Sequence, residues 1–227
     1  MTQSLRDLES TFARAWMLLM RNPVIVLPGI VAAALQTAAS IALQAVSDIV
    51  LLVGLLVTVT LAISLAQLAY TTGMAGAAWR HDRTSLRDGW EALAHRLWPA
   101  AGAAALLLVI GFCAAALAPF TFGITLLVYA VFFIYTMAAA IIGERPPIAG
   151  IFESASMALA NVLPTLAVVA LIAVTAALGG WLGWLVGRVS ELGGALATGL
   201  IGQVVVSYAS LVVAGEYLKL THHTREL

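Results

Sequence analysis

Three glutamines lie within long apolar stretches of the chain, at Gln36, Gln67 and Gln203. A side-chain amide has two donors and one acceptor, and leaving these groups unpaired in hydrocarbon is costly. Each glutamine therefore needs a polar partner on a neighbouring helix. One interpretation is a polar pocket or path at the membrane midplane. The other, which we favour, is a set of separate interhelical hydrogen bonds, worth about 0.6 kcal/mol each.

Other residue types that could do chemistry occur without the necessary partners. A zinc site needs three or four ligands at suitable spacing. The four histidines lie in tails and loops, at positions 81, 95, 222 and 223, and the single cysteine, Cys113, lies in an apolar stretch. No Ser–His–Asp set or pair of carboxylates is apparent. A nucleotide-binding loop must follow a strand, and no strand is predicted before the glycines at 179–183. The sequence therefore predicts no catalytic, cofactor-binding or metal-binding residue, and a protein that is not an enzyme.

The elements that position these residues must be membrane helices. Apolar residues make up 62% of the 227 residues and charged residues 10%, against about 45–50% and about 25% in soluble chains. This composition excludes a soluble enzyme, and the balance of 11 basic and 11 acidic residues excludes a nucleic-acid binder. Five stretches contain no Asp, Glu, Lys or Arg: 22–47, 49–79, 97–143, 154–187 and 192–215.

The charge-free stretches predict six transmembrane helices, because about 20 apolar residues cross a bilayer core. The stretch 97–143 is too long for one helix and is expected to turn at 118–123, where proline and glycine occur. We expect an all-α, polytopic membrane helix bundle that forms a single membrane domain over residues 1–227. Its spans are predicted at about 24–45, 50–78, 99–117, 123–142, 164–186 and 193–214.

The basic residues predict the orientation of the bundle. Six spans place both termini on one side of the membrane, and every Lys and Arg except Arg188 falls on that side. Short loops rich in Lys and Arg stay in the cytoplasm. Both termini are therefore expected to be cytoplasmic.

Amphipathic segments are predicted before three of the spans, at about 4–21, 85–98 and 148–162, with apolar residues at helical spacing. Ser85 and Asp88 have the spacing of a capping box. Each segment leads into a proline that opens the next span, and these prolines are Pro23, Pro99 and Pro164. The chain thus reads as three hairpins, each preceded by a helix at the cytoplasmic membrane surface. A threefold duplication and three unrelated entry helices both fit this pattern.

Two of these segments carry a resemblance. Ser85-Leu86-Arg87-Asp88-Gly89-Trp90, with Pro99, and Gly143-Glu144-Arg145-Pro146-Pro147, with Pro164, resemble a group of uncharacterised bacterial six-helix membrane proteins. The same pattern is similar to the membrane domain attached to some glycerophosphoryl diester phosphodiesterases. The resemblance implies a multi-pass domain of the bacterial inner membrane. It implies no catalytic residue, because the soluble barrel domain that carries the phosphodiesterase chemistry has no counterpart here.

Two further groups of residues are candidates for contacts. Small residues recur every four positions in the last two spans, and such stripes let helix backbones approach closely. We favour packing of the fifth span against the sixth, and the alternative is a contact between copies of the chain. The stripes are Gly179, Gly183 and Gly187, and Gly194, Thr198 and Gly202. The only local basic cluster is formed by Arg80, Arg83 and Arg87.

Two classes of function fit these features. The first is a non-enzymatic membrane protein that organises, anchors or assists a partner or a lipid environment through its cytoplasmic helices. The second is a small transporter or channel for a neutral or lipophilic solute. The lack of ionisable residues within the spans favours the first class. The expected partners are the lipid bilayer and either further copies of the chain or another membrane protein, and not nucleic acid.

Overall fold

The computed structural model describes residues 2–45, 50–188 and 191–223, and these are almost entirely helical. The predicted all-α class is confirmed. The helices are α1 (Thr2–Arg21), η1 (Pro23–Val26), α2 (Leu27–Ala45), α3 (Val50–His81), α4 (Leu86–His95), α5 (Leu97–Leu117), η2 (Ala118–Thr121), α6 (Ile124–Phe133), α7 (Thr136–Ile141), α8 (Pro147–Ala160), α9 (Val162–Gly187) and α10 (Glu191–His223).

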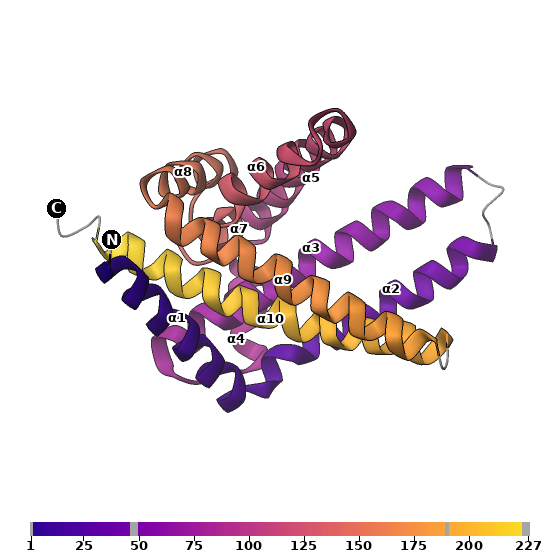
Figure 1. Cartoon of the computed structure of the whole chain (residues 1–227), viewed down its shortest axis with the longest axis horizontal. Helices are drawn as coiled ribbons and strands as arrows, with labels where there is room; N and C mark the ends of the chain where they lie inside the picture. The colour runs from indigo at the N-terminus through magenta and orange to yellow at the C-terminus, as the bar shows by residue number, and fades with distance from the viewer. Residues whose placement is uncertain (1, 46–49, 189–190, 224–227) are drawn as a thin grey trace.

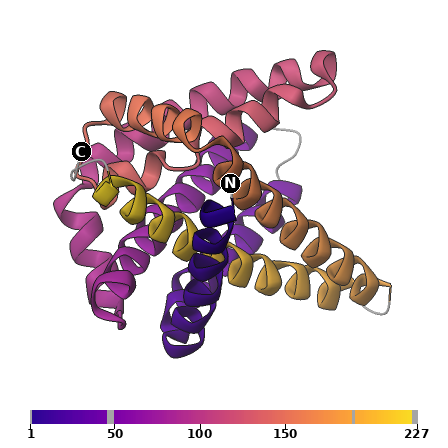
Figure 2. The same cartoon turned by 60° about the vertical axis from the view of Figure 1, so that its left-hand side comes forward.

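Consecutive helices pair along the chain as α2 with α3, α5 with α6, and α9 with α10. These three pairs diverge from one end of the molecule, where α1, α4, α7 and α8 pack around them (Figures 1 and 2). We call this end the base, comprising α1, α4, α7, α8 and the adjoining ends of α3, α5, α9 and α10. The opposite end, where the pairs turn back, is the distal end. The turns implied between the spans predicted at 24–45 and 50–78, and between those at 164–186 and 193–214, lie largely outside the described residues.

Among the described residues, five helices are long and apolar enough to cross a membrane, or six if one bent pair counts as a single span. The bent pair consists of Glu9–Arg21 and Pro23–Ala39, which meet at 91°. The helix predicted at 24–45 is thus present as η1 and α2, and α1 lies across its end. The multi-pass architecture expected from the composition is therefore confirmed at this level. The five spans are Leu52–His81, Leu97–Thr121, Ile124–Ile141, Val162–Gly187 and Ala197–Thr221.

The span predicted at 123–142 is interrupted between α6 and α7, and a serine of α8 forms hydrogen bonds with backbone groups at the interruption. The Ser154 hydroxyl accepts a hydrogen bond from the Tyr135 amide at 3.1 Å and donates one to the Phe132 carbonyl at 2.7 Å. Ser154 is fully buried. Because freed backbone groups in a membrane helix need a partner, this single hydroxyl fixes α8 against the break.

The three junctions between a base helix and the next span have one backbone conformation in common. The φ and ψ angles are −128° and 62° at Asn22, −126° and 26° at Arg96, and −132° and 51° at Asn161. The loops that follow α3 and α7 also agree, because Asp82 and Glu144 both have a positive φ, of 55° and 57°. The predicted capping box is present at the start of α4, between Ser85 and Asp88.

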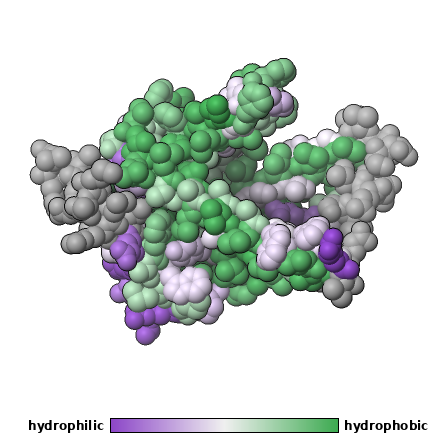
Figure 3. Space-filling model, viewed as in Figure 1, coloured by the Kyte–Doolittle hydropathy of each residue, from purple (hydrophilic) through white to green (hydrophobic). Residues whose placement is uncertain are grey.

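The packed core is concentrated near the base. The largest fully buried side chains include those of Tyr135, Tyr217, Leu18, Ile25 and Met74. Towards the distal end large apolar side chains are exposed, and Figure 3 shows apolar residues over most of the hairpin surface, with a hollow between the hairpins. Hydrophilic residues gather mainly near the base. The distal halves therefore present to their surroundings the surface that lipid chains require.

Candidate functional site

Gln67 of α3 and Gln203 of α10 form a direct amide–amide hydrogen bond, with Gln67 Nε2 donating to Gln203 Oε1. Both side chains are buried. Gly29 of α2 makes room for the pair, because a Cβ atom at this position would lie 2.6 Å from Gln203 Oε1 and 3.1 Å from Gln67 Nε2. Three helices therefore meet closely at this point.

The third predicted glutamine is not part of this pair. Gln36 of α2 donates from Nε2 to the Ser64 hydroxyl of α3 at 2.9 Å. None of the three glutamines lines either of the two cavities that are described below. The structure thus places them in interhelical hydrogen bonds and does not gather them around an open polar pocket.

Buried hydroxyls continue the contact of α10 with its neighbours towards the base. The Thr71 and Ser210 hydroxyl oxygens lie 3.5 Å apart, and the Ser207 hydroxyl donates to the Ile25 carbonyl at 3.3 Å. Thr71 and Ser207 are fully buried. Closer to the base, the Trp79 indole donates to the Leu211 carbonyl at 2.7 Å. This polar seam, from Gln67 to Trp79, covers about 18 Å of α3 by helical rise.

The small-residue stripes of α9 and α10 face each other over part of their length. A Cβ atom at Gly183 would lie 2.7 Å from Thr198 Cβ, and a Cβ atom at Gly187 would lie 3.7 Å from Gly194 Cα. Gly179 faces Ile201, whose Cγ2 atom would be 2.8 Å from an added Cβ. Gly202 is different, because nothing lies within 4 Å of an added Cβ and the residue lines a cavity.

The three arginines predicted as a cluster have different surroundings. Arg80 lines the cavity at the base. Arg87 pairs with Glu91 at 2.6 Å, and this hydrogen bond and charge raise the pKa of the Arg87 guanidinium. Arg83 is exposed and lines neither cavity. Only Arg80 is therefore placed where a bound group would meet it.

An apolar cavity of about 520 Å³ lies between the α5–α6 and α9–α10 helices, with α3 and α7 at its sides. Its polar lining residues carry hydroxyls: Thr72, Tyr129, Thr198 and Ser210. Tyr129 uses its hydroxyl to donate to the Leu107 carbonyl at 3.0 Å. The described residues that line the cavity include no Asp, Glu, Lys, Arg or His. The cavity is within the size range of about 300–1,000 Å³ that small-molecule sites have.

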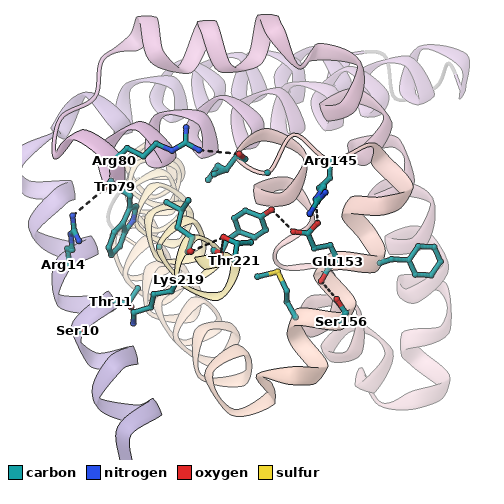
Figure 4. Close-up of a pocket in the computed structure, with 17 residues that line it drawn as sticks. Ser10, Thr11, Arg14, Trp79, Arg80, Arg145, Glu153, Ser156, Lys219 and Thr221 are labelled. Carbon is teal, nitrogen blue, oxygen red and sulfur yellow. Dashed lines mark hydrogen bonds and ion pairs between the residues drawn. The ribbon is translucent and has the colours of Figure 1, made fainter. Parts of the chain in front are cut away.

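A second, larger cavity of about 1460 Å³ lies at the base and has a basic lining (Figure 4). Four basic side chains line it, and each comes from a different element: Arg14 from α1, Arg80 from α3, Arg145 from the loop before α8, and Lys219 from α10. Glu153 of α8 is the only carboxylate among the described residues that line it. We call this space the basic cavity.

The charged groups of the basic cavity hold one another in place. Arg145 pairs with Glu153 at 2.6 Å, and the Tyr217 hydroxyl donates to the same carboxylate at 2.8 Å (Figure 4). On the other side, Arg14 stacks over the Trp79 ring at 4.7 Å and pairs with Asp82 at 3.3 Å. These contacts fix the arginine side chains at the cavity wall, although both ion pairs are partly open to solvent.

Sequence reasoning did not identify most of this cavity. Arg14, Arg145, Glu153 and Lys219 are separated along the chain, and no short motif connects them. An acidic residue followed by arginine occurs after both α3 and α7, at 82–83 and 144–145, but of these two arginines only Arg145 lines the cavity. Among the described residues no group of three His, Cys, Asp or Glu side chains converges in a way that would hold a metal ion.

The chain matches no protein-family model, no curated protein and no solved structure. The resemblance to the membrane domain of glycerophosphoryl diester phosphodiesterases therefore stays a prediction.

Proposed function

We propose that this protein is a non-enzymatic membrane protein that binds lipid and organises the lipid around it. The observation that carries the proposal is the apolar cavity between α5–α6 and α9–α10. Its walls come from five spans, and its polar groups are hydroxyls. Those of Thr72 and Thr198 donate to carbonyls of their own helices, and that of Tyr129 donates to Leu107 of α5. Such a lining suits a lipid chain better than an ion, which would need charges or a ring of carbonyls.

The proposal includes six spans in three hairpins, with the base at the cytoplasmic face of a bacterial inner membrane. The basic residues support this orientation, because Arg188 is the only one at the distal end among the described residues. Exposed tryptophans lie at both ends, as in interfacial aromatic belts. They are Trp16, Trp90 and Trp98 at the base and Trp181 and Trp184 near the distal end. A cysteine introduced by His222→Cys should not react with a thiol reagent that is added outside the cell and cannot cross the membrane. Reaction with that reagent would contradict this orientation.

Three helices of the base, α1, α4 and α8, are proposed to lie in the membrane interface. Their exposed surfaces carry large apolar side chains, which would be poorly placed in water. Examples are Met20 of α1, Trp90 of α4 and Phe152 of α8. The common backbone conformation of Asn22, Arg96 and Asn161 supports a threefold repeat of base helix, span and returning span.

Filling the apolar cavity provides the test. Gly202→Leu places a side chain in the cavity, where an added Cβ meets nothing within 4 Å. Gly54→Leu is the matched control, because Gly54 has equally open surroundings on α3 and does not line the cavity. Native mass spectrometry of the purified protein should show retained lipid in the parent and in Gly54→Leu, and less lipid in Gly202→Leu. Equal lipid retention in all three proteins would contradict the proposal.

The second candidate is a transporter for a neutral or lipophilic solute, and the hydroxyl-bearing but charge-free lining of the same cavity favours it over an ion channel. Solute flux into liposomes would distinguish it from a lipid-binding protein. Flux that is lost in Gly202→Leu and kept in Gly54→Leu would place the transporter first.

A further inference from the structure

We propose that the basic cavity is a binding site for a phosphate-bearing anion. This inference deepens the proposed function, on which it rests where the anion is a lipid headgroup. Four basic side chains from four elements line the cavity, against one carboxylate in its lining. Asp82 and Glu216, outside the lining, pair with Arg14 and Lys219, so the net positive charge of the cavity is carried mainly by Arg80. Such an excess of positive charge, in a space partly screened from water, attracts an anion.

The arginines retain donors that a phosphate can use. Arg80 donates one long hydrogen bond, to the Ile142 carbonyl at 3.5 Å, and forms no ion pair with any side chain that the structure describes. Arg145 contacts Glu153 through Nε, and Arg14 contacts Asp82 through one terminal nitrogen. A guanidinium has five N–H donors in a planar fork that matches the oxygens of a phosphate.

The remaining walls indicate that the anion carries an apolar part. Trp79, Phe152, Met157 and Leu218 also line the basic cavity. The apolar cavity follows it along one face of α10, because Val213 lines the apolar cavity and Tyr217, four residues later, lines the basic one. An anionic lipid with its phosphate at the arginines and a chain towards the hairpins would contact both.

The test compares two lipids that differ only in the phosphate. Phosphatidic acid and diacylglycerol with identical chains are titrated against the full-length protein in detergent and followed by native mass spectrometry. Phosphatidic acid should bind more tightly. Arg80→Gln should weaken its binding about tenfold, since a hydrogen bond to a charged group is lost. Diacylglycerol binding should not change.

Arg83→Gln is the matched control, since it removes the same charge from a neighbouring exposed site that does not line the cavity. Ser156→Glu is the second variant and adds a negative charge to the wall, on an exposed residue of α8. Ser156→Glu should weaken the binding of phosphatidic acid, as Arg80→Gln does. Circular dichroism and melting temperature verify that each variant is folded.

A competition experiment adds inorganic phosphate to the protein bound to phosphatidic acid. Displacement of phosphatidic acid by millimolar phosphate would show that the site also accepts free phosphate compounds. If phosphate does not displace the lipid, the site is specific for the lipid headgroup. Both results support an anion site. Equal affinity for the two lipids, or equal losses in Arg80→Gln and Arg83→Gln, would overturn it. If Gly202→Leu loses the binding of both lipids but keeps the binding of inorganic phosphate, the apolar cavity and the basic cavity are separate sites.

Discussion

Helix α10 contacts its two main neighbours in different ways. Against α9 the contact is between backbones, with Gly183 facing Thr198 and Gly187 facing Gly194. Against α3 the contact is between polar side chains, with Gln67 bonded to Gln203 and Thr71 beside Ser210. The first contact requires that side chains be small. The second requires that each polar group meet its partner.

This difference corresponds to what each contact must achieve. Within a bilayer, apolar burial between helices contributes little, so association depends on close packing and on hydrogen bonds. Helices α9 and α10 are consecutive, and a nonspecific close fit is enough to hold them together. Gln67 and Gln203 are 136 positions apart, and their directional bond connects α10 to the α2–α3 hairpin.

The largest effect is expected from Gly183→Leu. The new side chain would be forced against Thr198, whose Cβ would be 2.7 Å and whose Cα would be 3.1 Å from the added Cβ. Overpacking of this kind costs about 1–3 kcal/mol, so the melting temperature in detergent should fall clearly. Gly180→Leu, on the same helix, is the control because an added Cβ meets nothing within 4 Å. Equal melting temperatures in the two variants would show that the α9–α10 contact is not a backbone contact.

A smaller effect is expected from Gln67→Met, which leaves the Gln203 amide buried without its partner. Methionine has nearly the shape of glutamine, so the loss is mainly that of the hydrogen bond. Interhelical hydrogen bonds in membranes contribute at most about 1.7 kcal/mol, and removing both partners of a buried pair is often nearly neutral. Gln67→Met with Gln203→Met should therefore be more stable than Gln67→Met alone. A double variant that is less stable than the single one would mean that the two glutamines act independently.

The two contacts also differ in how far the sequence predicts them. The stripes at 179–187 and 194–202 are regular patterns in adjacent helices, so their pairing follows from a short turn. Even so, Gly202 does not pack against α9 but lies beside the apolar cavity, whose lining also includes residues of α6 and α7. The glutamines could be recognised as needing partners, but the pairing of Gln67 with Gln203, rather than with Gln36, depends on how the hairpins pack.

The base also combines features that the local sequence predicts with features that depend on how the helices pack. The helices at 2–21, 86–95 and 147–160 follow from local periodicity and lie within a few residues of their predicted bounds. The break between α6 and α7 could not be predicted, because it depends on Ser154 of another helix. The basic cavity likewise depends on four elements meeting, and the composition, with 11 basic and 11 acidic residues, does not give even the sign of its charge.

The smallest effect is expected from Thr71→Val, and it tests where the strength of the polar seam lies. Thr71 is fully buried, yet its hydroxyl donates to the Gln67 carbonyl of its own helix at 2.8 Å, and the contact with Ser210 is long, at 3.5 Å. Valine keeps the shape and loses only the hydroxyl. The loss should be at most about 0.6 kcal/mol, the average for interhelical hydrogen bonds in membranes.

A double-variant cycle of Thr71→Val with Ser210→Ala measures the coupling directly. Coupling near zero is expected, because the intrahelical bond already satisfies the Thr71 hydroxyl, so Ser210 gains little from facing it. The corresponding cycle for Gln67 and Gln203 should give clear coupling, since each of those amides depends on the other. Strong coupling at Thr71 would instead mean that the whole seam acts as one cooperative network, and the specificity of the α3–α10 contact could then not be assigned to the glutamine pair alone.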